Sequence, residues 1–550
     1  MSMAERRKAP ASGSVTWANV APPQRELQSD GAGPRPSQVK PRNLGELAVL
    51  LGAGLNDPRA ADTVVTGISA GSSQVRPGDL FAALPGAHRH GIAFADQALA
   101  AGAVAVFTDP AGADRLAGSG TAAVLLPDPR AALGRLAAEL YGHPSAALPV
   151  LGVTGTSGKT TTTFLVRAGL VAAGRRPGLI GTVGVFLDSE SVKTPFTTPE
   201  APQLQALLAV MRERGLDQVA MEVSSHALRL GRVDGTEFAV AAFTNLSQDH
   251  LDFHTDMEDY FQAKSLLFDG RARRELVVVD DAWGRRLVRP ATVTVSAADP
   301  GAHWYAEDVR VQADGSTRFG VRGPGLRFEA GCRIPGGYNI ANALLAFAIL
   351  AEAGVEVAEV APAVAAAQVP GRMERVDGDQ PFLVVVDYSH KPAGVAGALQ
   401  ALRPLTAGRL IIVLGCGGDR DRGKRPVMGE VAAAGADVLV VTDDNPRSEP
   451  PAEIRAAMIA GTRAVPAGRR AAVLEEGDRR AAIEQAIALA RAGDTVLIAG
   501  KGHETGQEVD GVLTAFDDVP VARAALAGLG HHPRPGTGVS GATEPGAGRP

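Results

Sequence analysis

The chain has 550 residues, a size that predicts three or four domains. Hydrophobic residues make up 45% of it, which is enough for several cores and excludes disorder throughout. Its formal net charge of −5 provides no basic field, so no nucleic-acid partner is expected.

Membrane and secretory signals are not found in the sequence. It contains no run of about 18 apolar residues, and residues 1–10 are charged without an apolar stretch behind them. Two cysteines, Cys332 and Cys416, are too few for a disulfide framework or a four-cysteine zinc site. We therefore expect a cytoplasmic protein without a membrane span, and a monomer.

The pattern along the chain predicts an α/β fold between two tails. Residues 1–42 mix Pro, Ser and Gly without a period and residues 530–550 are rich in Gly and Pro, so both are expected to be disordered. Between them, apolar strands alternate with helical stretches, which predicts three domains at 43–148, 149–369 and 370–529. Such alternation favours parallel, doubly wound sheets with ligand sites at the carboxyl ends of the strands. The expected buried strands are 80–84, 104–107, 149–153, 218–223, 238–243, 276–279, 383–386, 410–414, 438–441 and 495–498.

A phosphate-binding loop follows the strand at 149–153. A Gly-rich turn between a strand and a helix points backbone N–H groups at a phosphate, while a lysine neutralises its oxygens and a threonine can ligate Mg²⁺. The strict Walker spacing is not met, because Val153 occupies the first glycine position. The residues expected to hold a nucleotide are Gly155, Thr156, Ser157, Gly158, Lys159, Thr160 and Thr161.

Two further strands end in potential metal ligands. Glu222 ends one of them, where a carboxylate can hold Mg²⁺, and the segment 244–254 brings two histidines, including His250, close to two aspartates. Such a set could also bind zinc, but a hard Mg²⁺ fits better beside a phosphate loop. Each histidine could equally be a hydrogen-bonded loop residue.

Lysine is scarce, which makes its positions informative: only eight of the 55 basic residues are lysines. Lysine retained in a Gly-, His- or Asp-rich segment indicates chemistry that needs an ammonium or a free amine. Lys264 also has apolar neighbours, and desolvation would make its amine nucleophilic toward CO₂; the alternative is an ordinary surface lysine. The lysines in such segments are Lys159, Lys264, Lys391, Lys424 and Lys501.

These segments resemble the Mur ligases of peptidoglycan synthesis, over about residues 44–529. The resemblance rests on the phosphate loop, 222–226, 244–254, the helix with Lys264, and the segments at 336–342, 369–374 and 387–390. It implies a P-loop central domain, a Rossmann-like C-terminal domain, the cofactors ATP and Mg²⁺, and a carbamylated Lys264. Catalysis would then involve Lys159, Lys264, Glu222 and His250, with Mg²⁺ on Thr160, Glu222, His250 and Lys264. Further nucleotide contacts would come from Asn339, Arg372 and Asp387.

The third domain resembles the members of the family that add meso-diaminopimelate. The segment Asp444-Asn445-Pro446-Arg447 is typical of that type rather than of the lysine-adding type. Diaminopimelate carries one carboxylate more than lysine, and a guanidinium binds a carboxylate through two hydrogen bonds. Arg447 could instead simply cap a loop. The implied amino-acid contacts are Arg420, Asp444, Asn445, Pro446, Arg447, Gly500 and Glu504.

The resemblance extends to a nucleotide-sugar substrate, UDP-MurNAc-L-Ala-D-Glu. Its uridine segment departs from the family, because the usual Asp-Ser-Arg is here Gly71-Ser72-Ser73. The implied contacts are Ser72, Thr197, Thr198, Ser224 and Arg232.

The implied reaction is ATP-dependent ligation of meso-diaminopimelate to the D-glutamyl carboxylate, through an acyl phosphate. Two other functions remain open at this point. One is a ligase of the same superfamily for a folate or another muramyl peptide. The other is a nucleotide-driven switch or binding protein without ligation chemistry, which would leave the basic and acidic residues of the third domain unexplained.

Overall fold

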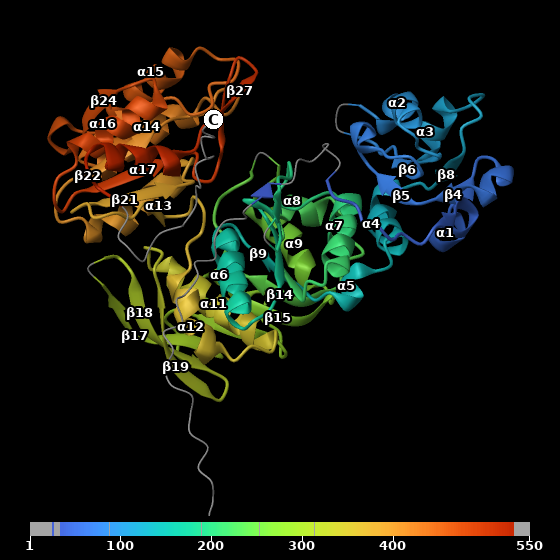
Figure 1. Cartoon of the computed structure of the whole chain (residues 1–550), viewed down its shortest axis with the longest axis horizontal. Coiled ribbons are helices and arrows are strands. Elements are labelled where there is room, and N and C mark those ends of the chain that lie inside the picture. The colour runs from blue at the N-terminus through green and yellow to red at the C-terminus, as the bar shows by residue number, and fades with distance from the viewer. Residues whose placement is uncertain are drawn as a thin grey trace, which may run out of the picture.

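A computed structural model describes residues 25–26, 33–86, 89–188, 190–251, 253–312 and 314–532. It consists of three α/β units arranged in chain order, as predicted, with the central unit between the other two (Figure 1). None of the described helices is long and apolar enough to cross a membrane. Most of the two expected disordered tails, at 1–24, 27–32 and 533–550, lies outside the described residues.

The N-terminal unit is built on a small sheet of five strands. Its order is β3-β8-β7-β6-β5, in which only β3 runs antiparallel to its neighbour. The strands are β3 (Gly54–Leu55), β5 (Gly67–Ser69), β6 (Asp79–Ala82), β7 (Ala105–Thr108) and β8 (Ala123–Leu125). A separate pair is formed by β2 (Arg42–Asn43) and β4 (Val64–Val65), and the helices are α1 (Leu44–Leu51), α2 (Ala95–Ala100), α3 (Pro110–Arg115) and α4 (Pro129–Leu140).

Part of the segment expected as an N-terminal tail contacts the folded units. Arg35 donates to both carboxylate oxygens of Asp79 at 3.1 and 2.9 Å and to the hydroxyl of Tyr141 at 2.6 Å. The backbone N–H groups of Ser37 and Gln38 donate to the Glu213 carboxylate of the central unit. Residues 33–38 therefore connect the first unit to the second.

The central unit contains a sheet of twelve strands whose middle is parallel. The order is β1-β12-β11-β10-β13-β9-β14-β15-β16-β17-β18-β19, with antiparallel strands on both flanks. The parallel strands are β10 (Pro177–Gly181), β13 (Gln218–Glu222), β9 (Val150–Thr154), β14 (Phe238–Phe243), β15 (Ala272–Val278), β16 (Val293–Ser296) and β17 (Trp304–Val311). The flanks are β1 (Arg25–Glu26), β12 (Glu190–Val192), β11 (Gly184–Leu187), β18 (Thr317–Gly323) and β19 (Leu326–Cys332).

Helices on the central unit carry several of the candidate residues. Lys159 begins α6 (Lys159–Ala172), Lys264 lies near the end of α9 (Met257–Ser265), and Asn339 lies in the first turn of α11 (Tyr338–Glu352). The remaining helices are α5 (Pro144–Ala147), α7 (Ala201–Glu213), α8 (Ser225–Arg229), α10 (Ala282–Arg285) and α12 (Val357–Ala366).

The C-terminal unit is a six-stranded sheet of order β20-β21-β25-β22-β23-β24, parallel except for β20. Its strands are β20 (Glu374–Arg375), β21 (Leu383–Asp387), β22 (Leu410–Leu414), β23 (Val438–Val441), β24 (Ala472–Glu475) and β25 (Thr495–Ala499). A hairpin of β26 (Gly506–Val509) and β27 (Val512–Ala515) follows β25. The helices are α13 (Pro392–Leu402), α14 (Lys424–Gly435), α15 (Pro451–Thr462), α16 (Arg479–Leu489) and α17 (Asp518–Gly528).

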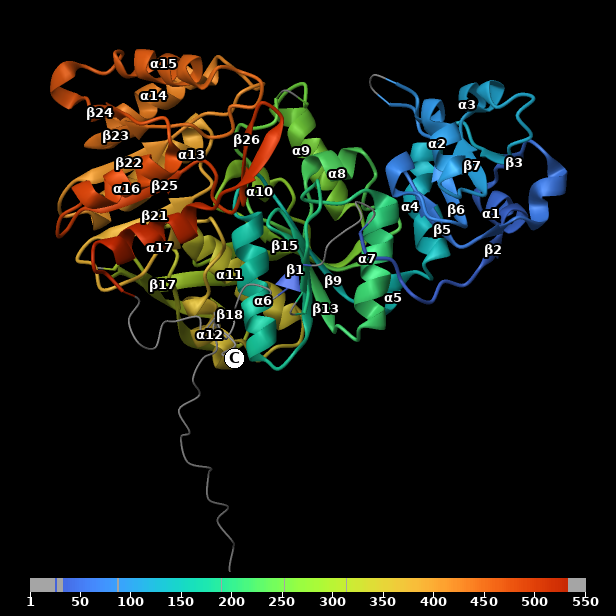
Figure 2. The same ribbon diagram turned by 45° about the horizontal axis from the view of Figure 1, so that its top comes forward.

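The second and third units share one continuous apolar core. Buried side chains of α6 and α11, such as Leu165 and Phe347, belong to the same cluster as Val369 in the linker and Val385 and Leu414 in the third sheet. In the tilted view of Figure 2, the C-terminal unit lies next to the central unit on the side away from the N-terminal unit. The shared core indicates that these two units are packed against each other and are not merely tethered.

Candidate active site

The phosphate loop is shaped by two glycines that no other residue could replace. Gly155 and Gly158 have φ angles of 141° and 89°, a region that favours glycine. A Cβ at Gly155 would overlap the Thr244 hydroxyl, and one at Gly158 would overlap the Asn342 amide. The loop then opens into α6, whose first-turn N–H groups have no acceptor within the helix and can bind phosphate oxygens.

The loop is held from outside by the segment that follows β14. Thr156 and Ser157 donate their backbone N–H groups to the backbone and side-chain oxygens of Asn245, at 2.8 and 3.0 Å. The hydroxyl of Thr244 donates to the carbonyl of Ser157 at 2.6 Å. The segment at 244–250 and the phosphate loop are therefore one hydrogen-bonded assembly.

Lys159 folds back onto the loop. Its Nζ donates to the carbonyls of Gly155 and Thr156, both at 2.9 Å. Burial lowers the pKa of Lys159, while the Glu222 carboxylate opposes that shift. The ammonium thus lies where the loop would receive an anion.

Glu222 is fully buried at the end of β13 and every oxygen of its carboxylate has a donor. Thr160 donates its hydroxyl to Oε2 at 3.1 Å, and Thr182 donates its N–H to Oε1 at 2.8 Å and its hydroxyl to Oε2 at 3.0 Å. The structure thus brings together the two predicted oxygen ligands, Glu222 and Thr160. Sequence reasoning missed Thr182, which carries no motif.

The two histidines of the predicted metal segment have different surroundings. His254 is 1% exposed and lies between the Asp259 carboxylate at 3.2 Å and the Ser225 hydroxyl at 3.0 Å, as expected of a hydrogen-bonded structural residue. His250 is half-buried, and burial lowers its pKa to about 4, with the charges of Lys391 and Lys159 among the further causes. His250 is therefore neutral at pH 7, the form that ligates metals.

The donor set fits a hard cation. Among the described residues, no group of three or more His, Cys, Asp and Glu side chains could hold a metal ion. Thr160 and Glu222, which are hydrogen-bonded to each other, instead offer oxygen donors beside the phosphate loop, and His250 lies on the segment that is hydrogen-bonded to the loop. Mg²⁺ typically takes one or two carboxylates and completes its shell with phosphate oxygens and water, so these residues fit it.

Lys264 is buried beside the phosphate loop and is not a surface lysine. It is 1% exposed, donates to the carbonyl of Gly155 at 2.8 Å, and its Nζ lies 4.5 Å from the centre of the Tyr260 ring. Burial, followed by the charge of Lys159, lowers the pKa of Lys264 well below its ordinary value. Burial thus shifts this amine toward the neutral form, which is the form that reacts with CO₂.

The three predicted nucleotide contacts lie around the loop and the linker. Asn339 donates to the carbonyl of Pro335 and accepts from Asn342, whose amide lies against Gly158. Arg372 lies 4.5 Å above the Tyr388 ring, and its buried Nε has no hydrogen-bond partner among the described atoms.

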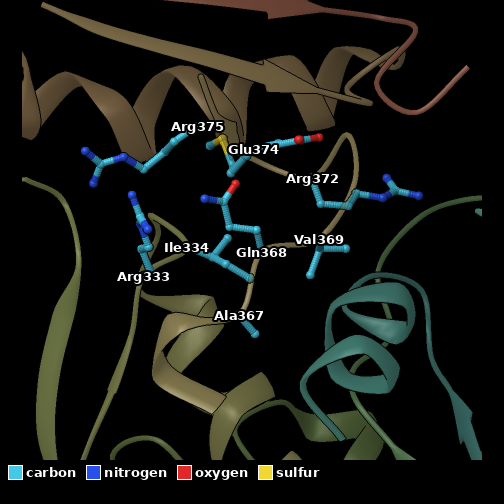
Figure 3. A pocket seen from close by; sticks show the side chains of 9 residues that line it. Arg333, Ile334, Ala367, Gln368, Val369, Arg372, Glu374 and Arg375 are labelled. Atoms are coloured by element: carbon cyan, nitrogen blue, oxygen red, sulfur yellow. The ribbon is translucent and has the colours of Figure 1, made fainter. Parts of the chain in front are cut away.

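Arg372 belongs to the linker between the second and third units. Figure 3 shows the small cavity beside this linker, with the Arg372 side chain extending away from Arg333 and Arg375. Asp387 ends β21 and accepts from the N–H groups of Met373 in the linker, at 2.8 Å, and of Ser389, at 2.9 Å. Asp387 thus fixes the linker that carries Arg372.

The predicted amino-acid contacts converge at the carboxyl ends of β23 and β25. Lys501 is fully buried and its Nζ donates to Asn445 Oδ1 at 2.9 Å and to Glu504 Oε2 at 3.2 Å. The Asn445 amide in turn donates to Glu504 at 2.9 Å, and a Cβ at Gly500 would lie 2.7 Å from Asp444. Sequence reasoning placed Lys501 in the motif but gave it no role.

Arg447 has a positive φ of 53°, and its backbone pairs with the hairpin at Glu508 and Asp510. Its guanidinium donates to the carbonyl of Gly418 at 2.8 Å and lies 3.4 Å from the Glu508 carboxylate.

A Cβ at Gly417 would lie 3.0 Å from the Arg447 guanidinium and 3.9 Å from the Arg420 side chain, so both arginines border one glycine turn. The side chain of Arg447 is 24% exposed, which leaves it accessible to a ligand. Pro446 lies in the same turn, where its carbonyl accepts from Glu449.

A cavity of about 420 Å³ separates the first unit from the central unit. Ser72 lines it, and its hydroxyl donates to Gln97 at 2.9 Å. Three arginines that sequence reasoning did not single out line the same cavity, namely Arg35, Arg89 and Arg130. They provide cationic groups although the segment 71–73 lacks the arginine usual in the family.

The other predicted substrate contacts connect this cavity to Glu222. Thr198 donates its hydroxyl to the carbonyl of Glu222 at 2.9 Å and accepts from the N–H of Ser224 at 3.1 Å. The Thr197 hydroxyl lies 3.1 Å from that of Thr182. Arg232 pairs with Glu200 at 2.8 Å and lies over the Phe196 ring, and both Glu200 and Phe196 line the cavity.

The third unit contacts the central unit at the phosphate loop side. Lys391, at the start of α13, forms an ion pair with Asp249, and Lys193 donates to the hydroxyl of Thr505 at 2.6 Å. The His503 ring lies close to the backbone of Thr182, which opposes the lowering of the His503 pKa by burial, and Thr182 in turn contacts Glu222. These contacts place the predicted diaminopimelate contacts around Asn445 and Glu504 on a surface that faces the unit with the phosphate loop.

Comparisons with known proteins agree with this architecture. Three family models match, described as the Mur ligase family catalytic domain at residues 64–141, the Mur ligase middle domain at 153–350, and the Mur ligase glutamate ligase domain at 371–502. The chain is 53% identical over 500 residues to a UDP-N-acetylmuramoyl-L-alanyl-D-glutamate--2,6-diaminopimelate ligase of Streptomyces coelicolor, covering 90% of this chain and 98% of the relative. A protein of the same name from Corynebacterium glutamicum is 49% identical, covering 84% and 92%.

A solved structure of a diaminopimelate ligase of that name is also similar. It superposes with a TM-score of 0.62 at 33% identity and covers 86% of this chain and 97% of the other. The three matching domains, the sequence identities and the site geometry together establish that this chain belongs to the Mur ligase family.

Proposed function

We propose that this protein ligates meso-2,6-diaminopimelate to the D-glutamyl carboxylate of UDP-N-acetylmuramoyl-L-alanyl-D-glutamate, with ATP as the energy source. The relatives named above are called ligases for these two substrates, and they span nearly the whole chain. The reaction belongs to peptidoglycan precursor synthesis, and we place it in the cytoplasm, where ATP is available.

The first half-reaction makes the carboxylate electrophilic. Lys159 and the N-terminus of α6 receive the phosphates of ATP, with Asn339, Arg372 and Asp387 around the rest of the nucleotide. Mg²⁺, held by Thr160, Glu222 and His250, would offset charge on the transferred phosphoryl group. Catalysis in this step is mostly positioning and electrostatic stabilisation.

Lys264 takes part as a carbamate in this proposal. Burial favours the neutral form of its amine, and addition of CO₂ to that amine with loss of a proton would place an anionic carbamate oxygen beside Gly155. The carbamate would add a further oxygen ligand for Mg²⁺ and a negative partner for Lys159.

The second half-reaction couples the acyl phosphate to an amine. Arg447 and Arg420 bind the far carboxylate of diaminopimelate, while Glu504, supported by Lys501 and Asn445, faces its ammonium group. Asp444, Pro446 and Gly500 complete this pocket. Ser72, Thr197, Thr198, Ser224 and Arg232 hold the nucleotide-sugar substrate on the opposite side of Glu222.

One observation carries the proposal: the arginine pair Arg420 and Arg447, together with the Glu504 carboxylate held by the buried Lys501, lies on the part of the third unit that contacts the phosphate-loop unit. The test is phosphate release by the purified protein with ATP, Mg²⁺, the dipeptide nucleotide and meso-diaminopimelate. We expect release only when all components are present. Release that is independent of any amino acid would instead indicate a nucleotide-driven switch and would overturn the proposal.

A further inference from the structure

Lys391 is a cation of the third unit that reaches the central unit. It occupies the position before α13 (Pro392–Leu402), and its ammonium forms an ion pair with Asp249. Its side chain is still 42% exposed, so the ammonium is accessible to a ligand and not locked in the core. The proposed function above gives Lys391 no role, although lysine is scarce in this chain.

Asp249 positions this ammonium at the phosphate loop. It lies two residues beyond Ser247, whose N–H donates to the Thr156 hydroxyl at 3.1 Å, on the segment that encloses the loop. The N–H of His250 donates to the same Asp249 oxygen that pairs with Lys391. The ion pair therefore lies directly beside a proposed Mg²⁺ ligand.

The charges that act on Lys159 agree with a position of Lys391 near the phosphate loop. Burial is the main cause of the lowered pKa of Lys159; the charges of Arg372 and Lys391 lower it further, whereas those of Glu222 and Asp249 oppose the shift. Three cations and two carboxylates thus act on one small volume, and Arg372 and Lys391 come from the linker and the third unit. A nucleotide triphosphate that took the place of Asp249 on Lys391 would supply negative charge to this set.

Lys193 is a control for the possibility that Lys391 only holds the second and third units together. Lys193 also crosses the boundary between the second and third units, where it donates to the Thr505 hydroxyl at 2.6 Å. Thr505 belongs to the segment that precedes the β26–β27 hairpin, and Lys193 directly follows β12 (Glu190–Val192), on the flank of the central sheet. If Lys391 only fastened the two units together, its loss would have the same consequences as the loss of Lys193.

We propose that Lys391 is a catalytic residue delivered by the third unit, which exchanges Asp249 for the γ-phosphoryl oxygens of ATP during transfer. This inference rests on the proposed function. In the step concerned, a carboxylate oxygen of the substrate attacks the γ-phosphorus and forms the new P–O bond. The P–O bond to ADP breaks with its electron pair on ADP, and no proton is gained or lost. The Lys391 ammonium stabilises the charge on the equatorial oxygens, as cations do in phosphoryl transfer.

The test measures how tightly the full-length protein binds two ligands. One is ADP with Mg²⁺, and the other is ADP with Mg²⁺ and aluminium fluoride, which mimics the transferred phosphoryl group. By isothermal titration calorimetry, Lys391→Met is expected to weaken binding of the aluminium fluoride complex roughly ten- to a hundredfold, with ADP binding unchanged. Lys193→Met should change neither affinity. Lys391→Arg, which retains the positive charge, should keep most of the affinity for the fluoride complex.

Equal weakening of both nucleotide forms by Lys391→Met, or no weakening of either, would overturn the inference. Lys391→Gln provides the same comparison if the methionine variant does not fold. Failure of the proposed function is a separate result, because wild-type protein that binds the fluoride complex but ligates no diaminopimelate would contradict only the substrate assignment.

Discussion

Lys264 donates a hydrogen bond of 2.8 Å to the backbone carbonyl of Gly155, a residue 109 positions earlier in the chain. Lys159 donates to that same carbonyl at 2.9 Å. Two lysine amines thus share one acceptor inside the phosphate loop, and burial favours the neutral form of both. Two ammonium groups at this position would repel each other, and carbamylation of Lys264 would remove that repulsion.

Replacing Lys264 by alanine should abolish most ligation while leaving nucleotide binding in place. We expect the rate to fall roughly a hundredfold or more, because the anionic oxygen ligand beside the metal is lost. Short carboxylates such as acetate or propionate, added at increasing concentration, should restore part of the rate. Unimpaired activity of the variant, measured as phosphate release, would contradict the carbamate.

Replacing Glu222 by glutamine should raise the Mg²⁺ concentration needed for half-maximal activity. The amide is nearly isosteric: its oxygen can still accept from the Thr182 N–H, and its NH2 group can donate to the threonine hydroxyls, so the fold should persist, but the negative charge that attracts Mg²⁺ is lost. Rates measured across a Mg²⁺ titration test this expectation. A titration curve that coincides with the wild type would exclude Glu222 as a metal ligand.

Arg447→Ala should affect the amino acid and not the nucleotides. Losing a two-hydrogen-bond contact to a carboxylate should raise the KM for meso-diaminopimelate roughly ten- to a hundredfold. The KM values for ATP and for the dipeptide nucleotide should stay within about twofold, since the described contacts of the Arg447 side chain are with the turn at Gly417 and Gly418 and with the hairpin. Steady-state kinetics with each substrate varied separately would reveal a different pattern if Arg447 only caps its turn.

Stability of the third unit should depend on the fully buried ion pair of Arg479 with Asp518. Arg479 donates to both oxygens of Asp518, at 2.8 and 2.7 Å, and both side chains are completely buried. Arg479→Met leaves an unpaired buried carboxylate, which should cost about 3–5 kcal/mol. Arg59→Met removes an ion pair whose arginine is 91% exposed, and it should lower stability far less, since water screens that pair. Thermal unfolding of the two variants side by side measures this difference, and equal midpoints would contradict it.

Acid should destabilise the contact between the second and third units through His503. Burial, with the charge of Arg372, lowers the pKa of His503 from 6.5 to about 4. Between pH 6.5 and 4 the unfolded chain therefore binds a proton that the folded protein does not, so the free energy of unfolding falls as the pH decreases through this window. Above pH 6.5 His503 contributes no pH dependence.

His503→Asn should flatten this part of the stability profile, because the titrating group is removed. Chemical unfolding of both proteins at several pH values between 4 and 7 provides the measurement. A variant whose profile keeps the full wild-type slope would show that other groups cause the pH dependence.

The sequence predicted ten of the parallel strands, each of them an apolar run: β6, β7, β9, β13, β14, β15, β21, β22, β23 and β25. It did not predict the parallel strands β5, β8, β10, β16 and β24. The segment β17–β19, whose strands pair antiparallel with one another, was also missed, since most of β17 is exposed or half-buried and forms no apolar run. The burial of Lys264 could be anticipated from its apolar neighbours. The contacts of Lys391 with Asp249 and of His503 with Thr182 could not, because local sequence carries no signal for how two domains face each other.

Some of the remaining site residues were predicted from the sequence and others were not. Motif spacing placed Thr160 and Glu222 correctly beside each other, since both follow neighbouring strands of one parallel sheet. Thr182, which holds both oxygens of Glu222, lies in a turn after β10 whose sequence has no distinguishing feature. The arginines that line the cavity of the first unit were likewise hidden, because arginine is abundant throughout this chain.

The most direct test of the account is the ratio of initial ligation rates with meso-diaminopimelate and with L-lysine, at equal concentrations of ATP, Mg²⁺ and the dipeptide nucleotide. A guanidinium left without its carboxylate partner costs roughly 1–3 kcal/mol or more, so diaminopimelate should be favoured at least about tenfold. Equal rates with the two amino acids, or no product with either, would contradict the claim that this protein activates an acid with ATP and joins it to an amine selected by its distant carboxylate.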